Sequence, residues 1–95
     1  MIKIIQKDNG KAGAFFAMDD NSEIGEMTYE WVNDDEIVIT YTGVSPVCQN
    51  QGVGKKMVAS CVDFARDGKV KVVPQCGFAK RVFDTTPDYT DVLDL

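Results

Sequence analysis

The hydrophobic pattern of this chain changes its period once, near residue 50, and that change constrains the fold more than any other feature. Residues 24–32 and 36–44 alternate apolar and polar side chains, which is the period of two shown by half-buried β-strands. Residues 52–67 repeat with a helical period instead, on a stripe formed by Val53, Met57, Val58, Cys61, Val62 and Ala65. The expected core is therefore a sheet from the first half with a helix packed on it.

The stretch 36–44 is the most β-prone of the chain, which favours a central strand. Its alternation predicts one face formed by Ile37, Ile39 and Tyr41 and another formed by Val38, Thr40, Thr42 and Val44. Gly43 invites a bulge and Pro46 lacks an amide donor, so both weaken ladder pairing near the end of the strand. We expect the strand to splay from its neighbour there.

Turn residues divide the rest of the chain into short elements. The segment 8–10 contains Asn-Gly, which predicts a hairpin between strands 2–6 and 13–18, and residues 19–22 and 33–35 turn the chain again. Gly68 should end the helix at its C′ position. A short strand, 69–73, is then broken by Pro74 and should lie parallel to strand 36–44 through a right-handed crossover. We predict a second helix at 78–83 and a loop or weak terminal strand to Leu95.

These elements define an α/β fold with a mixed sheet: an antiparallel four-strand meander, a helix, a parallel fifth strand and a short second helix. A chain of 95 residues can build one core, so residues 1–95 are expected to form a single domain. We expect a monomer or a weak homodimer.

Net charge bounds the possible partners. The chain carries 15 acidic against 10 basic side chains, a net charge of -5, and has no basic run. This composition argues against a nucleic-acid partner, because phosphate affinity needs clustered Lys and Arg. The acidic residues form a solvated surface or, alternatively, a surface that attracts a cationic substrate such as an amine.

Three cysteines, Cys48, Cys61 and Cys76, are odd in number and have no Cys-x-x-Cys spacing and no histidine beside them. A disulfide framework and a metal site are both disfavoured, and a reducing cytoplasm fits best. The apolar stretch in residues 1–8 is too short for a signal peptide, and no run reaches the roughly 20 apolar residues of a membrane span. We expect a soluble, unprocessed protein that does not enter membranes.

The segment Gln49-Asn50-Gln51-Gly52-Val53-Gly54-Lys55-Lys56 joins the predicted strand to the predicted helix. Its glycines expose backbone amides where the first helical turn has donors without partners. Two lysines in that turn oppose the helix dipole unless an anion docks there. The segment therefore predicts a phosphate site, with a plain connecting loop as the alternative.

The loop is neither a P-loop nor the Gly-x-Gly-x-x-Gly dinucleotide motif. It matches Gln/Arg-x-x-Gly-x-Gly/Ala through Gln49, Gly52 and Gly54, and so resembles the coenzyme-A-binding motif of the GNAT superfamily of N-acetyltransferases. The meander, the Thr42-Gly43-Val44-Ser45-Pro46 segment and residues 74–80 extend the resemblance over nearly the whole chain. The short length is similar to that of a minimal GNAT-like subfamily of about one hundred residues.

The resemblance implies a fold, a co-substrate and a site. It implies a GNAT-like sheet that binds acetyl-coenzyme A, with the pantetheine arm in the slot between the splayed strands. Val44 would face the pantetheine, and the pyrophosphate would lie on the loop amides. The cofactor-binding residues would be Val44, Gln49, Asn50, Gln51, Gly52, Val53, Gly54 and Lys55, with no metal.

Two residues are candidates for the chemistry. The minimal subfamily usually has a histidine where this chain has Tyr41, just before Thr42-Gly43-Val44. A phenol is a poor base at neutral pH but can position a water or protonate a leaving thiolate, and a buried core tyrosine is the alternative. Cys76 lies between a strand and a helix, where amides favour the thiolate. It could take an acetyl group or the amine proton, or be a buried filler.

The leading interpretation is an acetyl-CoA-dependent N-acetyltransferase that acts on a small-molecule or peptide amine. A coenzyme-A-binding module with little or no catalysis is the second, because Tyr41 replaces the usual histidine. A partner-binding domain without a ligand is the third. The sequence does not name the acceptor.

Overall fold

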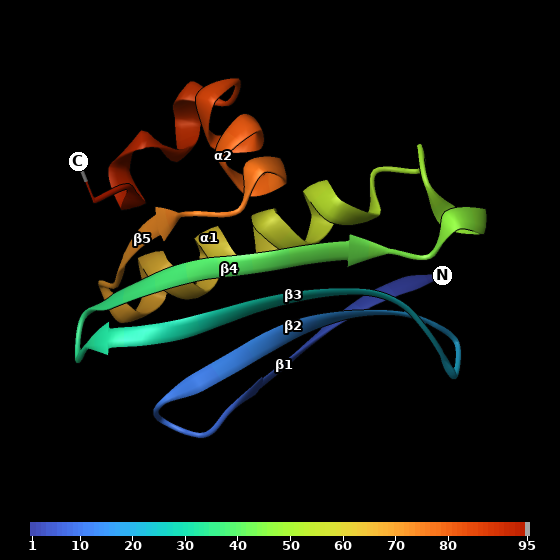
Figure 1. Cartoon of the computed structure of the whole chain (residues 1–95), viewed down its shortest axis with the longest axis horizontal. Coiled ribbons are helices and arrows are strands. Elements are labelled where there is room, and N and C mark those ends of the chain that lie inside the picture. The colour runs from blue at the N-terminus through green and yellow to red at the C-terminus, as the bar shows by residue number, and fades with distance from the viewer. Residues whose placement is uncertain (95) are drawn as a thin grey trace.

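The computed structural model describes residues 1–94 and consists of a sheet with its helices packed on one face (Figure 1). The strands are β1 (Ile2–Asp8), β2 (Ala12–Asp19), β3 (Ser22–Asn33), β4 (Glu36–Val44) and β5 (Lys71–Pro74). The helices are α1 (Val53–Gly68) and α2 (Gly77–Asp84), with short 3₁₀ turns η1 (Pro46–Cys48) and η2 (Pro87–Val92). The elements follow the predicted order.

The sheet has the strand order β1-β2-β3-β4-β5, with four antiparallel strands and β5 parallel to β4. The predicted meander and the parallel fifth strand are therefore confirmed. An isolated parallel bridge joins Val72 to Leu93 and adds the expected weak terminal strand contact. The final residue of that predicted segment, Leu95, lies outside the described residues.

The core lies between the sheet and α1. The sheet contributes fully buried Phe15, Met27, Tyr29, Ile37 and Ile39, and α1 presents the apolar stripe predicted from its period, of which Met57, Val58 and Cys61 are 0% exposed. Burying one such aliphatic or aromatic side chain contributes about 1.5–3 kcal/mol. Because several are buried together, the packing holds α1 in one position on the sheet.

The end of α1 differs in one residue from the prediction. Lys69, not Gly68, adopts the left-handed conformation, with φ of 55°. The Lys69 amide donates to the Arg66 carbonyl, and the Val70 amide donates to the Ala65 carbonyl. This is the pair of bonds that closes a helix in a Schellman motif, so the chain turns into β5 at Lys69.

Tyr41 does not share a face with Ile37 and Ile39, so that part of the prediction is wrong. Tyr29 of β3 pairs with Ile39, and the next residue back, Thr28, pairs with Tyr41, which leaves Thr40 as an extra residue in β4. Such a β-bulge reverses the alternation after it. Tyr41 is therefore on the face opposite the helices and is 54% exposed, while Thr42 turns toward the helices.

Strands β4 and β5 part earlier than the sequence suggested and for a different reason. Within the described chain, β4 pairs with β5 from Glu36 to Ile39, and the ladder stops at Pro74. The amides of Gln75 and Cys76 then both donate to the Ile39 carbonyl, which turns the chain into α2. Gly43 stays paired with Glu26 of β3, so the parting follows from Pro74 and the bulge at Thr40.

Candidate functional site

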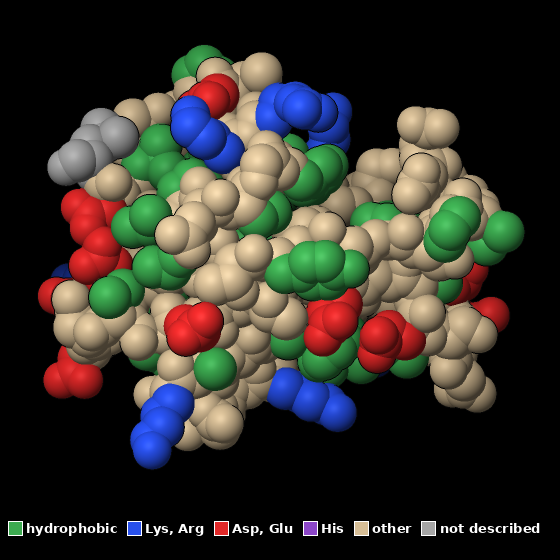
Figure 2. All heavy atoms as spheres, viewed as in Figure 1, with side chains coloured by type: hydrophobic (Ala, Val, Ile, Leu, Met, Phe, Trp, Pro, Cys, Tyr) green, Lys and Arg blue, Asp and Glu red, His purple; other side chains and the backbone are tan. Residues whose placement is uncertain are grey.

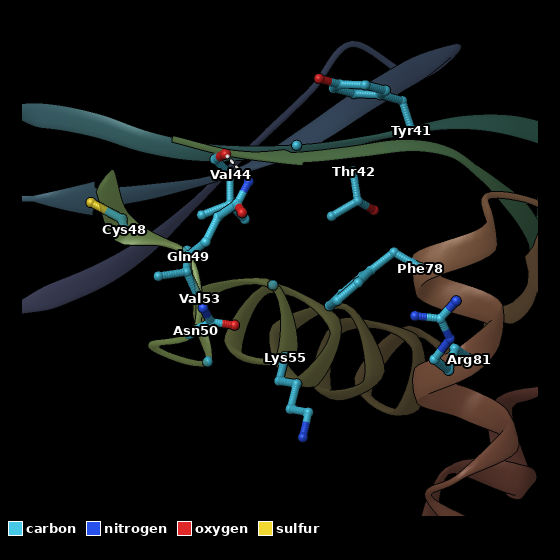
Figure 3. A pocket seen from close by; sticks show the side chains of 13 residues that line it. Tyr41, Thr42, Val44, Cys48, Gln49, Asn50, Val53, Lys55, Phe78 and Arg81 are labelled. Carbon is cyan, nitrogen blue, oxygen red and sulfur yellow. Dashed lines mark hydrogen bonds between the residues drawn. The ribbon is translucent and has the colours of Figure 1, made fainter. Parts of the chain in front are cut away.

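A pocket of about 860 Å³ lies along the part of β4 that continues beyond β5 (Figure 3). Its volume is typical of small-molecule sites. Four segments line it: the end of β4, the following loop, the first turn of α1 and one side of α2. The lining residues are Tyr41, Thr42, Gly43, Val44, Cys48, Gln49, Asn50, Gly52, Val53, Gly54, Lys55, Phe78 and Arg81.

The predicted phosphate loop forms the mouth of this pocket. Asn50 and Gly52 both have positive φ, 68° and 74°, which curls the loop tightly before α1. Gly52 is the N-cap residue and has no side chain to cap the helix, and the backbone bond from Lys56 to the Gly52 carbonyl begins the helical pattern. The amides of the turn before Lys56 are thus free to meet an anion.

A Cβ atom at Gly52 would have no heavy atom within 4 Å, so the space in front of this N-terminus is open. Gln49 folds back toward β4, where its Nε2 lies 3.5 Å from the Val44 carbonyl oxygen. Val44 itself is half-buried on the inner face, opposite Gly25 of β3. The structure thus brings most of the predicted cofactor-binding residues to one pocket; Gln51 lies in the same loop but is not among the lining residues.

The opposite wall is an aromatic ring that sequence reasoning missed. Phe78 comes from the first turn of α2 and lies over the first turn of α1. A Cβ atom at Gly54 would be 2.5 Å from the ring tip of Phe78, so the glycine is required for this contact. Figure 3 shows the ring between Thr42 of β4 and α1, where it narrows the pocket.

Cys76 lies just behind this wall and is held by two hydrogen bonds. Its sulfur is the N-cap of α2 and accepts from the Ala79 amide at 3.3 Å. Its Sγ is also 3.2 Å from the Thr42 hydroxyl oxygen. The Ala79 amide and the Thr42 hydroxyl group thus hold the half-buried sulfur in a fixed position beside the pocket. Thr42 lines the pocket, so its contact with the sulfur links Cys76 to the pocket.

Tyr41 and Cys76, the two predicted catalytic residues, are not brought together. The Tyr41 ring lies over Gly43 on the outer face of the sheet, whereas Cys76 lies beside Thr42 on the helix side. Tyr41 is still one of the residues around the pocket, at its β4 edge. Tyr41 and Cys76 therefore cannot act together as a base and a nucleophile in direct contact.

The sequence left five lining residues unassigned: Thr42, Gly43, Cys48, Phe78 and Arg81. The sequence placed Thr42 on the outer face of β4, because the bulge at Thr40 cannot be detected from the alternation of apolar and polar residues. Phe78 and Arg81 are three residues apart and so share one face of a helix, and this spacing was the available signal.

The family model described as GCN5-related N-acetyl-transferase matches residues 14–92. The chain belongs to this family. The match includes β4, the following loop and both helices, which together build the pocket. The five-stranded mixed sheet with its helices is the GNAT fold.

Solved structures agree with this GNAT assignment. The solution structure of a GCN5-like protein from Staphylococcus aureus is 36% identical, with a TM-score of 0.73, over 97% of this chain and 87% of that one. A GNAT family acetyltransferase from Elizabethkingia anophelis with acetyl-CoA bound is 17% identical, with a TM-score of 0.64, over 75% of this chain and 62% of that one.

The ribosomal-protein-S18-alanine N-acetyltransferase from Escherichia coli is 16% identical, with a TM-score of 0.68, over 82% of this chain and 53% of that one. The two relatives of low identity show the fold alone, and this chain spans little more than half of their length. No curated protein sequence matches the chain. Among the described residues, no helix has the length and apolar character needed to cross a membrane.

Proposed function

We propose that this GNAT protein is an acetyl-CoA-dependent N-acetyltransferase that transfers an acetyl group to an amine. The observation that carries the proposal is the position of the pocket. It runs from the uncapped N-terminus of α1 along the part of β4 that β5 leaves, as far as Thr42 beside Cys76. A long ligand with an anionic head and a reactive tail fits that arrangement.

The residues of the loop would hold the head of the ligand. Open space at Gly52 and the free amides before Lys56 suit a pyrophosphate, and Lys55 adds a positive charge. Val53, Asn50, Gln49 and Gln51 shape the loop around that group. Val44 and Phe78 would pack against the pantetheine arm. When bound, acetyl-CoA supplies the thioester carbonyl at the far end of the pocket.

Cys76 is the residue that we propose for the chemistry. Its sulfur would either take the proton that the acceptor nitrogen must lose or accept the acetyl group and pass it to the amine. In both cases, the amine nitrogen ends with the acetyl group and coenzyme A leaves as a thiol. Tyr41 stays a proposed proton donor or water-positioning group, on the face from which an acceptor would then approach.

A coenzyme-A-binding module with little catalysis is the second candidate. Tyr41 favours this candidate, because it stands where the minimal GNAT-like subfamily usually has a histidine. Its hydroxyl also lies across the sheet from Cys76. Tyr41→His separates the candidates, because gained turnover supports a slow or lapsed enzyme.

Release of free coenzyme A from acetyl-CoA tests the leading proposal. The acceptor panel should include polyamines, amino acids, lysine-rich peptides, an aminoglycoside and a peptide that begins with alanine. We expect turnover with at least one acceptor, strongly reduced both in Cys76→Ala and in Cys76→Ser, the control that keeps an acceptor for the Ala79 amide at the start of α2. If a folded protein that binds coenzyme A turns over none of them, the binding module is the better account.

The proposed compartment of this protein is the reducing cytoplasm, which the free state of all three cysteines supports.

A further inference from the structure

Arg81 of α2 lies at the pocket and has no role in the loop, the slot or the chemistry described above. It is one of two charged side chains among the lining residues, and the other is Lys55. Both are positive, although the chain as a whole carries a net charge of -5. Figure 3 shows Arg81 extending from α2 on the side that faces α1, where Lys55 lies on the first turn.

The side chains of both residues are uncommitted within the described chain. No hydrogen bond or ion pair among residues 1–94 involves the guanidinium of Arg81 or the ammonium of Lys55. Two cations elsewhere are paired, Arg66 with Asp91 and Lys80 with Asp84, each at 2.9 Å. Figure 2 shows basic side chains gathered over α2. An unpaired arginine at a pocket rim is available for an anion.

We propose that Arg81 binds the phosphomonoester of the ligand, the third phosphate group that coenzyme A carries on its ribose. This inference rests on the proposed function. The pyrophosphate uses the amides before Lys56, so a further anion needs a further donor. A phosphomonoester is close to dianionic at neutral pH, and a guanidinium fork binds such a group through two parallel hydrogen bonds. Lys55, on the first turn of α1, adds positive charge beside the proposed pyrophosphate position.

Comparing coenzyme A with 3′-dephospho-coenzyme A tests this assignment by isothermal titration. We expect the wild type to bind coenzyme A about 10-fold or more tightly than the dephospho form, the size of one charge-assisted contact. Arg81→Ala should remove that difference and leave affinity for the dephospho form unchanged. Lys80→Ala is the matched control, since it removes the neighbouring charge, which is paired with Asp84.

The possible results are distinct. If Arg81→Ala weakens both ligands equally, or neither, the phosphomonoester assignment is wrong while the proposed function stands. A wild type that binds both ligands equally also overturns it. If the wild type binds neither ligand, the proposed function fails and this inference fails with it. Thermal melts of both variants should match the wild type, because Arg81 is exposed.

Discussion

Phe78 occupies the space that a side chain at Gly54 would need. The ring belongs to α2 and the glycine to the first turn of α1, so one contact joins the two helices across the pocket. A glycine at this point of a helix costs about 1 kcal/mol relative to alanine. The glycine leaves room for the Phe78 ring to approach α1, which a larger residue would block.

Gly54→Ala should therefore separate binding from stability. The new methyl group would lie 2.5 Å from the ring tip, so Phe78 must rotate out of its position. We expect coenzyme A affinity to fall about 10-fold, on the scale of one lost aromatic contact, while the free energy of unfolding changes by less than about 1 kcal/mol. Titration and urea unfolding measure the two quantities. Unchanged affinity would show that the ring position does not matter for the ligand.

Gly52→Ala, unlike Gly54→Ala, should clearly lower the free energy of unfolding. A methyl group there meets no atom within 4 Å, but Gly52 has a φ of 74°, which costs other residues about 1–2 kcal/mol. We expect urea unfolding to report that loss. An unfolding free energy equal to that of the wild type would contradict the left-handed conformation of this loop.

Thr42→Val removes the hydroxyl beside Cys76 and keeps the shape of the side chain. Because the Thr42 oxygen lies 3.2 Å from the sulfur and shares a hydrogen bond with it, the variant should lose a contact that positions Cys76 and should lower kcat several-fold. The KM for acetyl-CoA should not change. Thr40→Val, on the outer face, is the control. A raised KM with unchanged kcat would mean that Thr42 only lines the pocket.

Cys61 should be the inert thiol of the three. It is fully buried on α1, and burial raises its pKa to about 12, so the thiolate is scarce at neutral pH. In the folded protein, a thiol reagent should modify Cys48 and Cys76 and leave Cys61 until denaturant is added, as peptide mapping would show. Rapid labelling of Cys61 in the native state would contradict the packing of α1 on the sheet.

Asp8 should give the protein a measurable acid sensitivity. Burial would raise the pKa of this carboxyl, but hydrogen bonds from the Tyr29 hydroxyl, the Gly10 amide and the Trp31 indole together lower it below its ordinary value. A lowered native pKa adds stability that is present above the unfolded pKa of about 3.9 and is lost as pH falls through the native pKa.

Urea midpoints between pH 6 and pH 2.5 test this linkage. Asp8→Asn should be less stable than the wild type at pH 6 and should lose less stability on acidification. The two curves should converge at low pH. Parallel curves would show that the carboxylate is not favoured by folding.

Sequence reasoning predicted what periodicity and turn chemistry encode. The stripe from Val53 to Ala65 and the alternation around Met27 and Tyr29 located the core, because burial imposes those periods directly. The Gly52 and Gly54 pair located the mouth of the pocket. Each of these signals is local in the chain.

The unpredicted features depend on contacts between distant segments. The bulge at Thr40 arises from the register between β3 and β4, so the alternation placed Tyr41 on the wrong face. The approach of Phe78 to Gly54 depends on how α2 docks after Pro74. No local pattern reports a distance between two helices, and Arg81 was missed for the same reason.

The most direct test of the central claim is isothermal titration of the wild type and Gly52→Asp with acetyl-CoA. The account predicts micromolar binding by the wild type and no detectable binding by the variant, because its carboxylate would stand in front of the α1 amides where the pyrophosphate should lie. Gly10→Asp, at the open hairpin turn far from the pocket, controls for the added charge at a glycine of positive φ. Equal binding by the wild type and Gly52→Asp, or none by the wild type, would contradict the account.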